Sequence, residues 1–188
     1  PVSWERACRA IYPTGEFEVV HQIDATLPGG GRMALLGVTV FSTYRQTLKC
    51  TLMTLEGFVL FSAEEDNTIR VFRAVPPFDR QAFGQGMIED LRFLFFYPKD
   101  RAFSIGWSKN NEHTCRYDPD GGSLTDVTLL ADGNWNVSRF TRSNSLSRSL
   151  ESRETASGMA GFSKKIRLKH HGWGGYALDL TLVKAGKR

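Results

Sequence analysis

The stretch that decides the fold runs Asp79-Arg-Gln-Ala-Phe-Gly-Gln-Gly-Met-Ile-Glu-Asp-Leu-Arg-Phe-Leu-Phe-Phe96. Within it, Phe83, Met87, Leu91 and either Leu94 or Phe95 recur at helical spacing. This spacing predicts an amphipathic helix with a strongly apolar face. Because the segments on both sides alternate like strands, the helix must lie against a sheet.

The ends of this helix are marked by residues that commonly start and stop helices. Asp79 is a suitable N-cap, and Pro98 prevents the helix from continuing. Gly84 and Gly86 each weaken the helix by about 1 kcal/mol relative to alanine. Their missing side chains would let the helix lie close to a neighbouring surface.

The segments around the helix alternate apolar and polar residues and end in turn residues, which is typical of antiparallel strands with one solvated face. The predicted strands are 17–23, 33–41, 47–55, 58–61, 68–75, 103–107, 112–117, 124–130, 135–141, 162–169 and 176–183. A short helix over residues 2–11 precedes them. We therefore expect a mainly β protein with a few helices: about eleven antiparallel strands in an incomplete, half-open barrel, with the mid-chain helix as a lid.

Length and composition fit one soluble-type globular domain over residues 1–188. The 13 phenylalanines predict a core built on aromatic rings. The net charge of +4 is mild, and no apolar run approaches the ~20 residues of a membrane span. The serine- and arginine-rich stretch 142–161 is predicted to be a long surface excursion. It has only Phe140 nearby for base stacking, so we expect no nucleic-acid partner.

The three cysteines, Cys8, Cys50 and Cys115, show no CxxC spacing. Alternation along their strands points Cys50 and Cys115 to the inner face of the sheet. One disulfide among the three and buried free thiols are both compatible with the sequence.

Motifs for catalysis or metal binding are missing from the sequence. Neighbouring His170 and His171 point to opposite faces of a strand, which is a poor arrangement for holding one ion. There is no GxSxG nucleophile elbow, and the Gly-rich segment 28–32 lacks the Lys-Ser/Thr of a phosphate loop. We therefore expect no catalytic residue, no metal site and no cofactor.

The order of parts resembles the LolA/LolB-type lipoprotein-carrier fold, and more specifically its uncharacterised bacterial branch of outer-membrane lipoprotein type. The resemblance covers most of the chain. It is carried by the segments 35–41 (LLGVTVF), 55–61 (LEGFVLF), 75–79 (VPPFD), 90–96 (DLRFLFF) and 164–168 (KKIRL).

The resemblance implies a non-enzymatic periplasmic carrier that holds acyl chains of lipids or lipoproteins in an apolar half-barrel, with an outer-membrane anchor and peripheral membrane contact as further options. The candidate lining residues are the inward apolar members of the predicted elements. They are Leu36, Val38, Val40, Leu48, Leu52, Phe58, Leu60, Phe83, Met87, Leu91, Phe95, Ile166, Leu178 and Leu180. On strand 33–41 the choice of face stays open, because Leu35 and Phe41 compete for the interior.

Two other classes of function stay open from the sequence. The first is a solidly packed structural or interaction module of the bacterial envelope, with the 142–161 stretch as its docking element. The second is a small-molecule enzyme built on an open-cone barrel. A carrier requires an apolar cavity, a module requires a filled core, and an enzyme requires polar groups that converge inside the cavity.

Overall fold

The fold of this chain is given by a computed structural model that describes residues 2–98, 103–108, 110–118, 122–155 and 161–188. Within these residues there are two helices, α1 (Val2–Ala10) and α2 (Gln81–Phe95), and twelve strands. The strands are β1 (Glu16–Thr26), β2 (Arg32–Ser42), β3 (Thr47–Met53), β4 (Val59–Asp66), β5 (Thr68–Ala74), β6 (Phe103–Trp107), β7 (His113–Tyr117), β8 (Leu124–Leu129), β9 (Trp135–Phe140), β10 (Leu146–Thr155), β11 (Ser163–His170) and β12 (Tyr176–Lys187).

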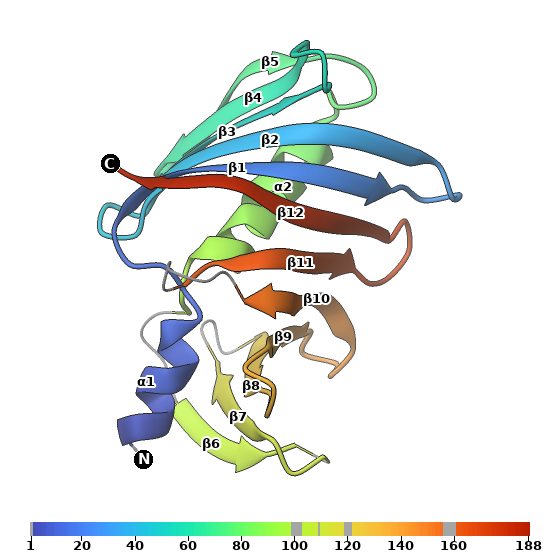
Figure 1. The fold of residues 1–188 in the computed structure, drawn as a ribbon. Coiled ribbons are helices and arrows are strands. Elements are labelled where there is room, and N and C mark those ends of the chain that lie inside the picture. The colour runs from blue at the N-terminus through green and yellow to red at the C-terminus, as the bar shows by residue number, and fades with distance from the viewer. Residues whose placement is uncertain (1, 99–102, 109, 119–121, 156–160) are drawn as a thin grey trace. The chain divides into compact units, whose positions relative to one another are not determined.

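The strands form one antiparallel sheet that does not close into a barrel. Their order is β5-β4-β3-β2-β1-β12-β11-β10-β9-β8-β7-β6, so β5 and β6 are the two edge strands (Figure 1). The predicted class, mainly β with an incomplete barrel and a mid-chain helix, is confirmed. The described residues contain twelve strands, one more than the eleven that the sequence predicts.

The chain divides into two compact units, each built from discontinuous segments. Unit 1 comprises Pro1–Tyr12, Thr26–Gly31 and Tyr97–Asp179, and unit 2 comprises the remaining residues. Because the segments of both units alternate along the chain, the sequence contains no simple linker between them. The prediction of a single domain over residues 1–188 stays a prediction.

In unit 2, α2 packs on the buried face of the strands that precede it. The Phe95 ring stacks on Phe41 of β2 at 4.4 Å between centroids, and it lies 6.1 Å from the His21 ring of β1. A Cβ at Gly84 would lie 3.5 Å from the Phe61 ring, an ordinary van der Waals contact, so α2 lies near β4 at a distance that alanine would also allow. A Cβ at Gly86 would meet nothing within 4 Å, so the structure does not support the expectation that the two glycines are what let the helix lie close to its neighbour. The core of this unit is aromatic, as expected.

The start of α2 differs from the prediction. The helix begins at Gln81, and its N-cap residue is Arg80, which makes no capping hydrogen bond through its side chain. Asp79 lies one residue too early to cap it. Tertiary packing of the apolar face, and not the cap, therefore stabilises this helix.

The twelfth strand lies in the stretch that the sequence assigned to a surface excursion. Residues 146–155 form β10, which pairs with both β9 and β11. Its inward positions include Leu150, which is fully buried, and Ser152, which is 5% exposed. Glu151 between them points to the other face, where its carboxylate lies 3.4 Å from the Lys169 ammonium of β11. Serine is small enough to fit a crowded sheet interior. β10 therefore forms although its sequence lacks the regular alternation of large apolar and polar residues that marks the other strands.

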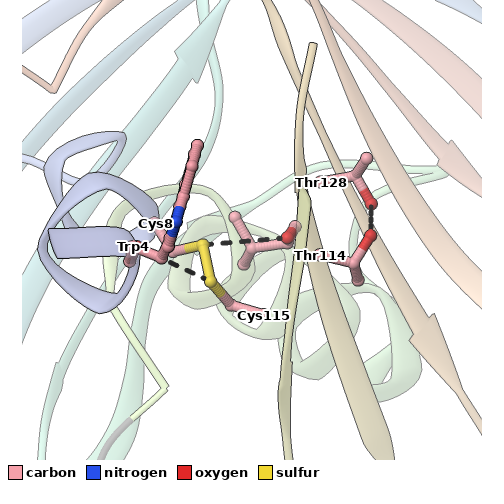
Figure 2. Close-up of a disulfide and its surroundings, with 6 residues drawn as sticks. Trp4, Cys8, Thr114, Cys115 and Thr128 are labelled. Carbon is pink, nitrogen blue, oxygen red and sulfur yellow. Dashed lines mark hydrogen bonds between the residues drawn. A yellow bond between two sulfur atoms is a disulfide. The ribbon is translucent and has the colours of Figure 1, made fainter. Parts of the chain in front are cut away.

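In unit 1, α1 packs on β7 and β8 and is covalently attached to the sheet. A disulfide joins Cys8 of α1 to Cys115 of β7 (Figure 2). The third cysteine, Cys50, is a buried free thiol. Of the alternatives that the sequence left open, the structure therefore contains both: one disulfide and one buried thiol. The inward orientation of Cys50 and Cys115 is confirmed by their burial.

Candidate functional site

Several of the predicted lining residues meet on the buried face of unit 2. Leu48 lies directly opposite Phe41 in the β2–β3 register, and Phe41 stacks on Phe95. Leu52 lies opposite Phe61 in the β3–β4 register, and the Phe61 ring contacts Phe83 edge-on at 5.2 Å. Leu48, Leu52, Phe83 and Phe95 therefore belong to one aromatic and aliphatic layer between the sheet and α2.

Other predicted residues lie on the opposite face of the same strands. Leu36, Val38 and Val40 are half-buried and alternate with Leu35 and Phe41, which are buried. The choice that the sequence left open on this strand is thus resolved: Leu35 and Phe41 point to the interior. Val40 and Leu48 both line the charged groove of unit 2 described below, whereas Leu36 and Val38 do not line it.

The remaining predicted residues are spread over both units. Phe58 is 55% exposed, with the guanidinium of Arg73 over its ring at 5.1 Å. Ile166 and Leu180 are buried. The half-buried members of the set are Leu60, Met87, Leu91 and Leu178. The role of all fourteen residues as the lining of an acyl-chain cavity stays a prediction.

The aromatic layer of unit 2 contains a titratable group, His21. Burial lowers the pKa of His21 from 6.5 to about 4, so the ring is neutral in the folded state at pH 7. The unfolded chain takes up a proton below pH 6.5, whereas the folded protein does so only near pH 4. The folded state is therefore most stable with respect to this group above pH 6.5, and the free energy of unfolding falls as the pH drops from 6.5 toward 4.

We expect the variant His21→Leu to lose less stability in acid than the parent protein. Between pH 7 and pH 4.5, the free energy of unfolding of the parent should fall by about 2.5 kcal/mol more than that of the variant. Urea unfolding at both pH values measures this difference. Because carboxylates titrate in both proteins, only the difference between parent and variant reports on His21. If the free energies of unfolding of both proteins fall in parallel with pH, His21 contributes nothing to the acid sensitivity.

A partly open cavity of about 480 Å³ lies in unit 1, against α1. We call it the α1 pocket. Its three walls are α1 together with Ile11, the β8–β9 turn, and the start of β11. Its lining residues are Trp4, Ala7, Ala10, Ile11, Leu129, Leu130, Gly133, Asn134, Trp135, Gly161, Phe162 and Ser163. The volume and the mostly apolar lining are typical of sites for small apolar ligands.

The wall formed by the β8–β9 turn is held by a dense set of hydrogen bonds. The backbone N–H of Leu130 donates to the carbonyl of Asn134 at 2.9 Å, and Gly133 adopts a φ of 85°. Asp132 accepts hydrogen bonds from the backbone and side-chain amides of Asn134, which lower the pKa of its carboxyl group. The backbone N–H of Trp135 donates to Ser152 Oγ at 2.8 Å. This wall is thus preorganised.

The wall formed by α1 is attached to β7 in two ways. The first is the Cys8–Cys115 disulfide (Figure 2), and the second is the Trp4 indole, which stacks on the His113 ring at 3.3 Å between centroids. The same His113 ring also contacts Trp107 at 4.1 Å. The disulfide and the ring stack fix the position of the helix that faces the pocket.

None of the fourteen predicted lining residues contributes to the α1 pocket. The sequence did contain a signal for one wall, because Trp4, Ala7 and Ile11 recur at helical spacing near the N-terminus. The signal for the other walls was only local apolarity around Leu129 and Phe162. Sequence reasoning missed that these three segments meet.

A second groove, of about 380 Å³ in unit 2, is lined by charged residues of both signs. Its charges largely pair with one another: Arg45 lies 2.9 Å from Glu16, and Arg70 lies 2.6 Å from Glu64. Neutralised pairs of this kind suit a solvated surface better than an apolar ligand.

Groups suited to catalysis are scarce in the described part of the chain. Burial raises the pKa of the Cys50 thiol to about 11, which makes it a poor nucleophile. Among residues with described positions, no three histidine, cysteine or carboxylate side chains cluster to hold a metal ion. Neither of the described helices has the length and hydropathy required to cross a membrane.

Comparisons with known proteins address the fold. No protein-family model and no curated protein match the sequence. Solved structures do match. A LolA superfamily protein from Nitrosomonas europaea has a TM-score of 0.64 at 11% identity, with 98% of this chain and 91% of that chain covered. A domain from Vibrio parahaemolyticus named for outer membrane lipoprotein sorting has a TM-score of 0.57 at 9% identity, with 98% and 91% covered.

A third solved structure, a DUF1329 family protein from Desulfovibrio piger, has a TM-score of 0.62 at 10% identity, with 99% of this chain and 92% of that chain covered. Identities this low carry information on architecture alone. All three alignments extend over nearly the whole chain, in agreement with the layout that the sequence suggested. The fold of this chain is therefore LolA/LolB-like.

Proposed function

We propose that this protein is a non-enzymatic carrier that binds the acyl chains of lipids or lipoproteins. The observation that carries the proposal is the α1 pocket, an apolar cavity of about 480 Å³ with two tryptophans, two leucines and a phenylalanine in its wall. The LolA/LolB-like fold supports it, because one similar structure is named for lipoprotein sorting. The disulfide favours an oxidising compartment, which supports a periplasmic location as part of this proposal.

The energetics of such a site are sufficient for binding. Each methylene moved from water into an apolar pocket contributes about 0.8 kcal/mol. About ten methylenes then contribute roughly 8 kcal/mol, from which the ordering of ligand and pocket must be subtracted. Because the full 8 kcal/mol would correspond to about micromolar affinity, we expect dissociation constants weaker than about 1 μM for single-chain ligands once these costs are subtracted.

The proposal is tested with delipidated protein, a fluorescent single-chain acyl probe and native mass spectrometry. We expect saturable uptake of the probe and a complex of one protein with one ligand. A protein that neither takes up the probe nor retains lipid through purification would contradict the proposal. That result would favour the solidly packed interaction module of the bacterial envelope.

Contact with a membrane belongs to the same proposal, and it is supported by Trp173 at the tip of the β11–β12 hairpin. The Trp173 side chain is fully exposed, between Gly172 and Gly174, which have φ values of 115° and 76°. The adjoining segments 139–150 and 168–178 carry three arginines and one lysine, and the lysine, Lys169, lies 3.4 Å from Glu151. An exposed indole beside cationic residues suits the interface of an anionic bilayer.

We expect Trp173→Ala to weaken binding to vesicles that contain phosphatidylglycerol by about three- to tenfold, because the indole no longer enters the interface. Vesicle co-sedimentation at low and high salt measures this effect. Trp107→Ala is the matched control, because Trp107 is also exposed (62%) but lies at the sheet edge on β6. Equal losses for both variants, or binding that ignores lipid charge, would contradict a specific role for the hairpin.

A further inference from the structure

The edge strand β5 of unit 2 is exposed on both of its faces. Six of its seven residues are exposed, and the last, Ala74, is half-buried. A strand that covers a core alternates buried and exposed residues, as β3 does. β5 nevertheless carries apolar side chains, because Ile69 is 39%, Val71 50% and Phe72 59% exposed. The strand therefore presents apolar surface that the described residues of its own unit leave uncovered.

The outer side of β5 also offers backbone for pairing. Among the described strands β5 pairs with β4 alone, and it stands at the end of the sheet (Figure 1). The N–H and C=O groups that point away from β4 form a template for a further strand. The register with β4 is regular from Thr68 to Val71, and Phe72 is an extra residue without a counterpart on β4. A further strand can therefore extend the sheet along Thr68–Val71.

The charges of β5 are positive, and they are directed toward its own sheet. The strand contains Arg70 and Arg73 and no carboxylate. Arg70 lies 2.6 Å from Glu64 of β4. The Nε of Arg73 donates to the backbone carbonyl of Val59 at 2.7 Å, and its guanidinium lies over the Phe58 ring at 5.1 Å. Charged side chains that point outward protect an edge strand from pairing, but here both arginines contact their own unit.

Exposed aromatic rings and cations lie together on this surface. The Lys49 ammonium lies 5.7 Å from the centre of the Phe72 ring, as the Arg73 guanidinium lies over the Phe58 ring. Phe58 and Phe72 are both more than half exposed. A carboxylate that approaches here meets a cation, and an apolar side chain next to it meets a ring. The surface thus suits a segment that contains acidic and apolar residues.

Two other occupants fit this surface less well. A second copy of this chain would bring the arginines of two β5 strands together, and β5 has no carboxylate to oppose them. The hydrocarbon of a bilayer has no donors or acceptors for the backbone of an edge strand. An extended acidic segment supplies both the backbone pairing and the opposite charge.

We propose that β5 is the docking edge for an extended acidic segment of a partner protein. The segment adds to the sheet as a further strand along Thr68–Val71 and directs its carboxylates to Arg73 and Lys49. This interaction goes beyond acyl-chain binding and does not depend on it, because no residue of β5 lines the α1 pocket.

The experiment measures the fluorescence polarisation of three labelled peptides that are titrated with the full chain. The first alternates glutamate and valine, the second has lysine in place of glutamate, and the third is the acidic peptide with every backbone nitrogen methylated. We expect the acidic peptide to bind at least tenfold more tightly than either of the others. The lysine peptide lacks the charge, and the methylated peptide lacks the N–H donors that pair with the edge.

The variant Ile69→Lys places an exposed lysine on the docking edge, a common way in which proteins prevent strand addition. It should weaken binding of the acidic peptide at least tenfold and leave the affinity for an acyl probe unchanged. Ile105→Lys is the matched control, because Ile105 is exposed to a similar extent (36%) on the other edge strand, β6. It should keep the parent's affinity for the peptide. Thermal unfolding checks that both variants are folded.

A second variant tests the charge separately. In Arg73→Glu, the preference for the acidic over the lysine peptide should shrink at least tenfold, because the cation that faces the carboxylates is replaced by an anion. Arg73 is exposed, so the fold should tolerate the change.

Several results would overturn the proposal. They are equal binding of the acidic and lysine peptides, undiminished binding of the methylated peptide, equal losses in Ile69→Lys and Ile105→Lys, and no saturable binding of the acidic peptide. A concentration-dependent dimer, or binding to vesicles, that Ile69→Lys abolishes would assign β5 to a second copy or to a membrane instead. None of these results bears on acyl-chain binding, which the acyl probe tests independently.

Discussion

Replacing both Cys8 and Cys115 by alanine is expected to lower the free energy of unfolding by about 4–5 kcal/mol. The disulfide closes a loop between residues 107 positions apart, so it removes a large amount of conformational entropy from the unfolded chain. Denaturant unfolding under non-reducing conditions measures the change. The same loss should follow when a reductant is added to the parent protein.

Cys50→Ala is the control for this prediction, because it removes a buried cysteine that takes part in no disulfide. It should cost only about 1 kcal/mol, the usual effect of a small truncation in a core. If the reductant leaves the stability of the parent protein unchanged, the disulfide does not anchor α1. The double variant should also bind the acyl probe more weakly, because α1 is one wall of the α1 pocket.

Filling the α1 pocket with the variant Ala7→Trp should reduce the affinity for an acyl probe by roughly 50-fold. Ala7 lines the pocket from α1, so an indole at this position occupies space that the ligand needs. Displacement of about three methylenes costs about 2.4 kcal/mol, which corresponds to that factor. Probe titration measures the effect.

The matched control for the pocket variant is Arg6→Trp. It introduces the same side chain on the same helix, at an exposed position that is not part of the lining. Arg6→Trp should bind the probe with the parent's affinity. Equal affinities for Ala7→Trp and the parent would show that the ligand does not occupy the α1 pocket.

The fold was largely predictable from the sequence because its two main signals are local. The helical spacing of Phe83 and Phe95 predicted α2, and alternation predicted eleven of the twelve strands in the described residues. β10 was missed because its inward positions include Ser152 in place of a large apolar residue. The helix start was misplaced because Asp79 has the right chemistry but lies one residue too early.

The candidate site was far less predictable. The α1 pocket is formed by three segments distant in the sequence, represented by Ala7, Leu130 and Phe162. Each segment is apolar, but periodicity says nothing about which apolar segments meet. The pairing of Cys8 with Cys115 was beyond prediction for the same reason, because spacing alone did not distinguish it from the other pairs.

Photo-crosslinking with a diazirine-bearing acyl ester, followed by peptide mass spectrometry, tests whether an acyl chain binds in the α1 pocket. We expect labels on the peptides that contain α1, the β8–β9 turn and the start of β11, and we expect unlabelled ester to compete with the labelling. Labels confined to α2 and strands β2–β4, or labels that unlabelled ester does not displace, would contradict it.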